Sequence, residues 1–308
     1  MAPCLTAGVE LTVDAGDAAL PATLDLPAGP VRGAVAALHG AQAGARSYFC
    51  YAHLARALPS LGVAVLRYDR RPGLPRRDVP LDTQARDAAA AVRLLRRRLG
   101  PVRVGLWGFS QGAWAAPLAA ARYPGLVDFL VLVSSCGVSP ARQMRFGTAA
   151  QLRQRGFTGA DQAELAELRT ALEEYQRGGV DRATAQVVVD RFAGRPWFPL
   201  AYVPRELSGR PGTWTDLDFD PAPVFAQVRC PVLLYYGETD GWVPVAESVA
   251  VWRAAAAGAG TSLTIRRLAG CDHLPTVGGR EELDAVSPAY TATLLAWLDA
   301  HLPGGGVR

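Results

Sequence analysis

Short apolar runs separated by helix-like stretches recur through the first part of the chain. Residues 34–38, 63–68 and 102–107 are such runs, and each is followed by a turn and, before the next run, by a helical pattern. Near-continuous apolar strands are typical of sheets that are covered on both faces. Because strands and helices alternate, the pattern predicts an α/β fold with a mostly parallel sheet.

Further strands are predicted on either side of these runs. Alternating apolar and polar residues over 9–26, interrupted by a turn at 14–17, indicate an antiparallel hairpin at the edge of the sheet. Apolar runs at 129–133, 232–236 and 263–268 continue the strand series, and the last helix is expected over 287–301.

A long helical insertion interrupts this rhythm between the strands at 129–133 and 232–236. Leu165, Leu168, Leu172 and Tyr175 recur at helical spacing, and the stretch 195–204 is aromatic and rich in proline. Ligands of open α/β sheets bind at the carboxyl ends of the strands, where such an insertion forms a cap. We therefore expect a core at 1–139, a helical cap at 140–227, and the rest of the core at 228–308.

Composition and charge are those of an ordinary globular protein. Half of the 308 residues are hydrophobic, 19% are charged, and the net charge is +4. The arginines at 96–98 fall on the solvated face of an amphipathic helix, and a nucleic-acid surface needs a larger basic excess. We expect no nucleic-acid partner, and the sequence leaves the oligomeric state open, with a homodimer as one option.

Cysteine usage and the N-terminal segment suggest a compartment. The five cysteines are scattered without C-x-x-C spacing, so they predict neither a disulfide framework nor a zinc site. The first residues lack the pattern of a signal peptide, and no apolar run is long enough to span a membrane. The expectation is a cytoplasmic, reduced protein with no metal, no cofactor and no membrane contact.

The strongest chemical motif is Gly108-Phe-Ser-Gln-Gly112. This G-x-S-x-G sequence follows the strand at 102–107 and opens a helix at 113–122. A serine on such a sharp turn projects its hydroxyl away from the sheet, and the two glycines let neighbouring backbone pass close by. Ser110 is therefore the candidate nucleophile. The alternative is a plain turn with a helix-capping serine.

A serine hydroxyl needs a base, and the chain offers four histidines. His273 follows the last strand, in a loop that can reach back to Ser110, so it is the candidate base. His53 falls on an apolar helix and is expected to be structural, and His301 lies near the end of the chain. His39 is interpreted as a residue that shapes its loop.

An acid is required to hold the imidazole in the right tautomer. Asp240 comes directly after the strand at 232–236 and emerges at the same sheet edge as Ser110. Glu238 is an alternative, and Asp272 is expected to point away from its neighbour His273. The chain order Ser, Asp, His is that of α/β-hydrolases.

Two backbone amides are needed to stabilise an oxyanion. Gln111, directly after the candidate nucleophile, supplies one. The second is expected from the loop after the strand at 34–38, where Ala41 is favoured and Gly40 permits close approach.

At these residues the sequence resembles a bacterial α/β-hydrolase family related to dienelactone hydrolases, acyl-CoA thioesterase-like proteins and prolyl oligopeptidase catalytic domains. The resemblance covers most of the chain and implies the same triad, Ser110, Asp240 and His273. It implies a structural role for Asp69 and Arg70. Two departures are Ala113, where relatives often have a second glycine, and 41–43, where they often have glycine or serine. The matching segments are 39–40, 66–70, 108–114, 131–134, 230–234 and 237–244.

The resulting hypothesis is hydrolysis of an ester or thioester of a small to medium, apolar acyl substrate through an acyl-serine. One interpretation of the aromatic residues at 192–214 is that they line the cap and favour an apolar acyl group; the other is that they form the cap's own core. Two alternatives use the same fold: acyl transfer or cyclisation by the same triad, and a non-catalytic ligand-binding protein. The candidate substrate-binding residues are Trp197, Phe198, Tyr202 and Trp214, with Phe192 beside them.

Overall fold

The computed structural model describes residues 8–41, 44–72, 78–209 and 214–303. Its centre is an eight-stranded sheet in the order β1-β2-β4-β3-β5-β6-β7-β8. The strands are β1 (Val9–Asp14), β2 (Ala19–Asp25), β3 (Gly33–Leu38), β4 (Val63–Tyr68), β5 (Arg103–Phe109), β6 (Leu130–Val133), β7 (Val232–Gly237) and β8 (Leu263–Leu268). The hairpin predicted over 9–26 is present as β1 and β2, which pair antiparallel, and β3 to β8 run parallel as expected.

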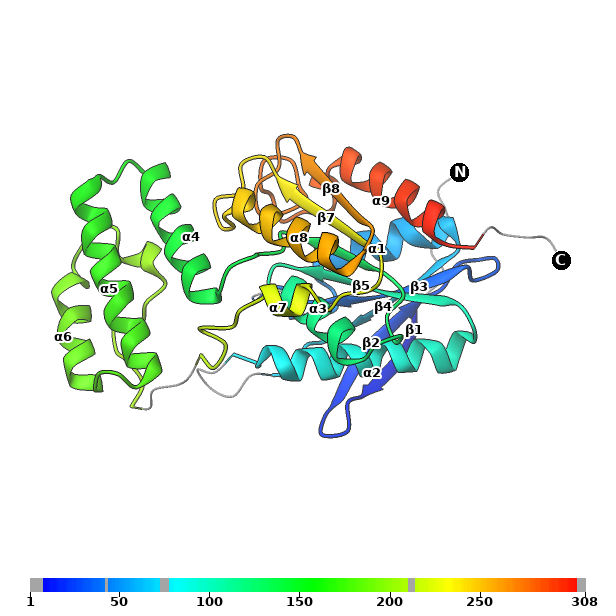
Figure 1. Ribbon diagram of the computed structural model, residues 1–308, viewed down its shortest axis with the longest axis horizontal. Helices are drawn as coiled ribbons and strands as arrows, with labels where there is room; N and C mark the ends of the chain where they lie inside the picture. The colour runs from blue at the N-terminus through cyan, green and yellow to red at the C-terminus, as the bar shows by residue number, and fades with distance from the viewer. Residues whose placement is uncertain (1–7, 42–43, 73–77, 210–213, 304–308) are drawn as a thin grey trace.

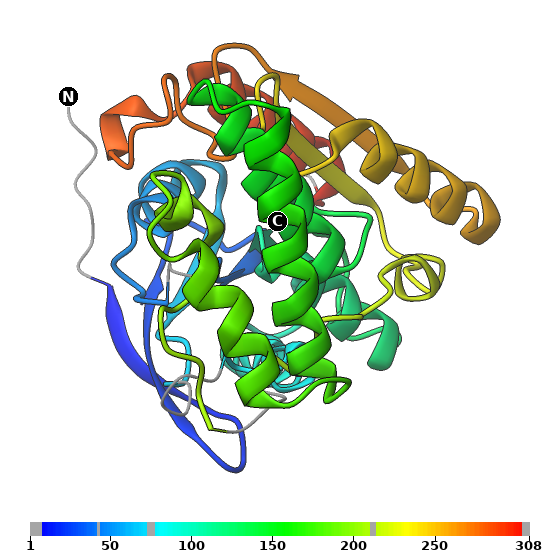
Figure 2. The same ribbon diagram turned by 90° about the vertical axis from the view of Figure 1, so that its left-hand side faces the viewer.

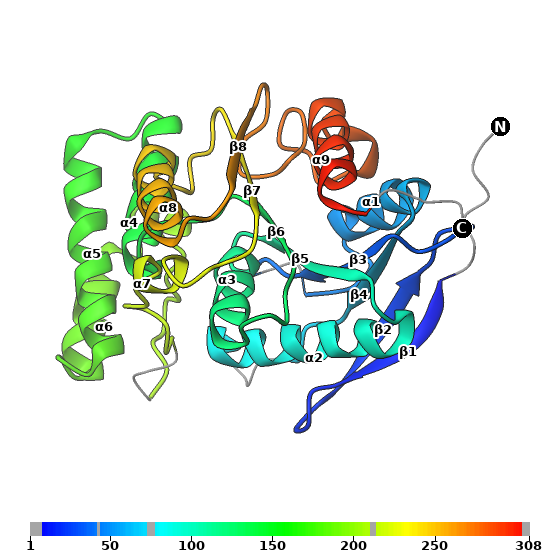
Figure 3. The same cartoon turned by 45° about the vertical axis from the view of Figure 1, so that its right-hand side comes forward.

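Helices cover both faces of this sheet (Figures 1 and 3). One face packs against α2, α3, α7 and α8, and the other against α1 and α9. The helices of these layers are α1 (Phe49–Ala57), α2 (Leu81–Leu99), α3 (Gly112–Arg122), α7 (Ala222–Phe225), α8 (Val245–Ala259) and α9 (Pro288–His301), with short 3-10 turns at Leu58–Leu61 and Leu283–Ala285.

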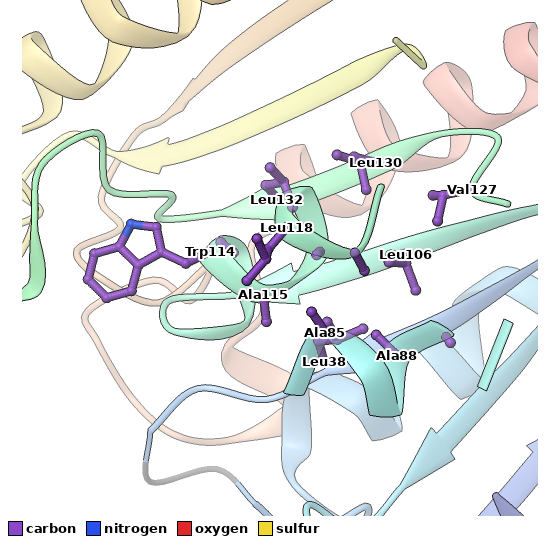
Figure 4. Close-up of a cluster of buried hydrophobic side chains, with 14 of the residues drawn as sticks. Leu38, Ala85, Ala88, Leu106, Trp114, Ala115, Leu118, Val127, Leu130 and Leu132 are labelled. Atoms are coloured by element: carbon purple, nitrogen blue, oxygen red, sulfur yellow. The ribbon is translucent and has the colours of Figure 1, made fainter. Parts of the chain in front are cut away.

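Alternate residues of each central strand enter different cores. Ala36 and Leu38 of β3 face the α2–α3 side, whereas Val35 and Ala37 face the α1–α9 side. Figure 4 shows part of the first core, where Leu118 of α3 lies among side chains of the sheet. Burial on both faces explains why these strands are apolar throughout rather than alternating.

Between β6 and β7 the chain forms a separate group of helices, here called the inserted helices. They are α4 (Pro140–Gln154), α5 (Gly159–Arg177), α6 (Arg182–Phe192) and a 3-10 turn at Phe198–Ala201. Figures 1 and 2 show them gathered at one end of the molecule, beside the sheet. They have their own hydrophobic cluster, which includes Leu165, Leu168, Leu172 and Trp197.

After the inserted helices, the chain rejoins the core of the sheet at α7, before β7. Phe225 of α7 stacks on Trp252 of α8, with ring centroids 3.9 Å apart, and both belong to the core of the sheet. In the described part of the chain, no helix is long and apolar enough to cross a membrane.

Candidate active site

Ser110 stands on a sharp turn between β5 and α3. Its φ of 51° lies in the left-handed region, which a non-glycine residue adopts only under constraint. Both glycines of the motif are needed for space. A Cβ at Gly108 would collide with the backbone of Gly112, and a Cβ at Gly112 would come within 2.8 Å of the Leu38 backbone. The turn and the start of α3 are therefore packed directly against the end of β3.

The structure brings Ser110, His273 and Asp240 together. His273 Nε2 lies 3.0 Å from Ser110 Oγ, and His273 Nδ1 lies 3.2 Å from each carboxylate oxygen of Asp240. Asp240 follows β7 and His273 follows β8, so the parallel strands deliver both to the same sheet edge as Ser110. This is the nucleophile–base–acid order of contacts that activates a serine hydroxyl.

Contacts with three neighbouring segments hold His273 and its loop in place. Ser134, which follows β6, donates its hydroxyl to the His273 carbonyl at 2.8 Å. The Phe109 ring lies 5.3 Å from the His273 ring. A Cβ at Gly237 would collide with the carbonyl of Asp272, so the His273 loop passes directly over the end of β7. These contacts fix the imidazole next to Ser110.

Asp240 is buried and ionised. Burial opposes its charge, but His273 and the amides of Trp242 and Val243 outweigh that effect and hold the pKa of Asp240 below its usual range. The two amides donate to Oδ1 at 2.8 and 3.1 Å. Of the sequence-based alternatives, Glu238 is exposed, and Asp272 accepts the Leu274 amide instead.

The other three histidines bind elsewhere. His39 Nε2 donates to the Tyr68 carbonyl at 2.6 Å, and burial lowers its pKa to about 4. His53 contacts the Thr291 hydroxyl at 2.9 Å, and burial lowers its pKa to about 4 as well. His301 bonds a carbonyl of its own helix. His39 and His53 are therefore neutral packing residues.

The candidate oxyanion donors flank Ser110. Ala41 lies in the loop after β3 and, with Gly40, lines the cavity at Ser110, whereas Gln42 and Ala43 lie outside the described residues. Gln111 is the N-cap residue of α3 and lies directly after Ser110.

An arginine connects the two segments that carry these donors. Arg70, in the turn after β4, donates to Gln111 Oε1 at 2.6 Å and to Asp78 Oδ1 at 3.0 Å, and Gln111 in turn donates to Asp78. The backbone amide of Arg70 also donates to the Gly44 carbonyl at 2.8 Å, in the loop that follows Ala41. Sequence reasoning assigned Arg70 a structural role only by resemblance and did not find this link.

A cavity of about 610 Å³ opens above Ser110. The sheet side of its lining includes Tyr48, Phe109, Thr239, Trp242 and Leu274 in addition to His273. The segment of the inserted helices contributes Gln143, Met144, Gln151, Gln154, Arg155 and Tyr202. Of these six residues, only Tyr202 was predicted from the sequence to bind substrate. The regular spacing of the glutamines along α4 is the signal that could have found them.

The four aromatic residues predicted to bind substrate occupy different environments. Tyr202 lines the cavity, is half exposed and packs edge-on against Trp242. Trp197 and Phe198 are buried in the cluster of the inserted helices, which is the second of the two interpretations. Trp214 is half-buried, donates its backbone amide to Gln176 and is not among the described residues that line the cavity.

A metal site needs several ligating side chains close together. Among the described residues, no group of three or more histidine, cysteine, aspartate or glutamate side chains is arranged to hold one.

A serine on a strained strand-to-helix turn, reached by loops from the ends of later strands, is the arrangement that defines the α/β-hydrolase class. The sequence model described as "Alpha/beta hydrolase family" matches residues 35–286, and the chain therefore belongs to that family of enzymes. A search of curated proteins finds no match.

Solved structures share the fold at low sequence identity. Proline iminopeptidase from Mycobacterium smegmatis is 19% identical with a TM-score of 0.59, over 95% of this chain and 98% of its own. Est1E from Butyrivibrio proteoclasticus is 18% identical with a TM-score of 0.59, over 96% of this chain and 99% of its own. Dienelactone hydrolase from Anabaena variabilis is 17% identical with a TM-score of 0.53, over 96% and 98%.

Proposed function

We propose that this protein is a serine hydrolase that cleaves an ester or thioester of a small molecule through an acyl-Ser110 intermediate. The observation that carries the proposal is the continuous contact from Ser110 Oγ through His273 to the ionised Asp240. A binding protein on this fold would have no need of a strained serine aligned with a base.

In the first step, Ser110 Oγ attacks the carbonyl carbon while its proton passes to His273 Nε2. The Asp240 carboxylate stabilises the resulting imidazolium through Nδ1. The carbonyl oxygen becomes an oxyanion, and we assign its two donors to the backbone amides of Gln111 and Ala41. Each such donor contributes about 2.7–4 kcal/mol to the transition state.

Collapse of this intermediate breaks the bond to the leaving alcohol or thiol, which takes its proton from His273. Water then attacks the acyl-serine carbonyl while His273 accepts a proton from it, and the acid leaves as Ser110 regains its hydrogen. The inserted helices act as a cap in this scheme, since α4 supplies one wall of the cavity above Ser110.

Intact mass after incubation with a fluorophosphonate tests the proposal. Ser110 Oγ displaces fluoride from phosphorus, so the wild type should gain one adduct, whereas Ser110→Ala should gain none. His273→Ala should label at least a hundredfold more slowly, because general-base catalysis contributes about 10²–10⁴-fold. Equal labelling of wild type and Ser110→Ala would contradict the assignment of the nucleophile.

A further inference from the structure

The wall of the cavity that α4 contributes is made largely of carboxamides. Gln143, Gln151 and Gln154 all line it, together with Met144 and Arg155 at the end of the helix. Positions 143, 147, 151 and 154 fall on one face of a helix, so the three glutamines, here called the glutamine face, lie on the side of α4 that lines the cavity. Such a wall differs from the aromatic lining that was one of the two interpretations of the sequence.

This glutamine face is fixed with respect to the triad. Gly147, at its centre, lies so close to the Trp242 ring that a Cβ there would collide with it. The backbone amide of Trp242 donates to Asp240 at 2.8 Å. Helix α4 is thus packed directly on the loop that carries the acid, and the carboxamides have a defined position over the cavity.

Gln151 has an unsatisfied polar group. Its Nε2 is covered by surrounding atoms and has no hydrogen-bond partner among the described residues. Buried amide groups without a partner are rare in folded proteins, because each costs the free energy of its lost hydration. Gln151 also lines the cavity, so its carboxamide lies within reach of an oxygen of a ligand bound there.

An alkyl chain would be a poor occupant of such a cavity. It would displace water from Gln143 and Gln154 and would offer no acceptor to Gln151. Leaving one amide unpaired offsets the burial of about two methylene groups, so loss of hydration at Gln143 and Gln154 would cancel much of the gain from a short chain. An acyl group with its own polar atoms avoids this loss.

We propose that the acyl group of the substrate carries amide, keto or hydroxyl oxygens that hydrogen-bond to the glutamine face of α4, with Gln151 as the principal donor. This inference rests on the proposed serine-hydrolase function and names the class of substrate for the same site. The glutamines determine specificity and take no part in bond breaking.

Two p-nitrophenyl esters of equal chain length test the inference, one of N-acetyl-β-alanine and one of hexanoic acid. After correction for their rates of hydrolysis by hydroxide, the wild type should show a kcat/KM at least tenfold higher for the amide-bearing ester. Gln151→Met, which keeps the shape and removes the donor, should lower that kcat/KM about tenfold and raise it for the hexanoate.

Gln162→Met provides the matched control, because Gln162 is a glutamine of similar exposure on α5 that does not line the cavity. It should leave the ratio of the two kcat/KM values at the wild-type level. A wild-type preference for hexanoate, an equal change of both esters in Gln151→Met, or hydrolysis of neither ester by protein that labels with fluorophosphonate would overturn the inference alone. Failure of the wild type to label would overturn the proposed function as well.

Discussion

Single side chains determine the chemistry of this site, and Asp240 is the clearest case. Its carboxylate accepts hydrogen bonds from two backbone amides and also faces His273 Nδ1. A carboxylate can accept all three because it has only acceptors. An amide group cannot, since one of its two ends is a donor.

We therefore expect Asp240→Asn to fold but to lower kcat by about 10³–10⁴-fold, because His273 is then held in the wrong tautomer. Steady-state kinetics on the best ester, with the melting temperature as a check on folding, measure this. Glu238→Gln removes the exposed carboxylate that the sequence left as an alternative and should retain most of the activity. Wild-type kcat in Asp240→Asn would rule out Asp240 as the acid.

At the scale of elements, Arg70 holds three segments together: the loop after β3, the turn after β4 and the start of α3. Its bond to Gln111 and its backbone bond to Gly44 fix the two segments assigned as oxyanion donors. Because an oxyanion exists only in the transition state and intermediates, misplacing its donors lowers kcat more than it alters KM.

Arg70→Met is accordingly expected to lower kcat about ten- to a hundredfold with KM changed by less than about threefold, as judged from initial rates. The neighbouring Arg71 is a matched control, because its side chain bonds Asp87 and Asp17 and not Gln111 or Asp78. Arg71→Met should lower the melting temperature and leave kcat near that of the wild type. Parallel losses of stability and kcat in both variants would mean that Arg70 is merely structural.

The contact between α4 and the acid loop gives another prediction at this scale. Gly147→Ala adds about 1 kcal/mol of helix propensity but forces a Cβ into the Trp242 ring, and overpacking typically costs 1–3 kcal/mol. We expect α4 to shift and kcat/KM to fall about ten- to a hundredfold. Gly159→Ala on α5, where a Cβ meets nothing within 4 Å, should not lower it. Measured kcat/KM values decide between the two cases. Equal values in Gly147→Ala and Gly159→Ala would mean that the contact between α4 and Trp242 does not position the site.

Local patterns explain why the sheet and the position of Ser110 could be predicted from the sequence. Strands covered on both faces are apolar throughout, and the G-x-S-x-G turn follows one of them. The environment of the inserted helices could not be predicted in the same way. Periodicity shows that Trp197 and Gln151 belong to helical or turn segments, but it does not show that Trp197 is buried among the inserted helices and that Gln151 lines the cavity.

For the whole molecule, two buried neutral histidines link stability to pH. His39 bonds the Tyr68 carbonyl at the end of β4, and His53 bonds Thr291, joining α1 to α9. Burial lowers the pKa of each to about 4, whereas both gain a proton near pH 6.5 in the unfolded chain. Between these values the unfolded chain binds more protons, so the free energy of unfolding falls as the pH falls.

Each histidine should lower the free energy of unfolding by about 1.4 kcal/mol per pH unit below pH 6.5 and should contribute no pH dependence above it. Urea unfolding at pH 7.5, 6.0 and 5.0 measures the decline. One substitution separates the contribution of His53 from the contributions of other titrating groups. His53→Gln keeps a hydrogen-bonding side chain next to Thr291 but does not titrate, so its stability at pH 5.0 should decline less than that of the wild type by about the contribution of one histidine. Identical declines in the two proteins would show that His53 is protonated equally in the folded and unfolded states, which its burial between α1 and α9 makes unfavourable.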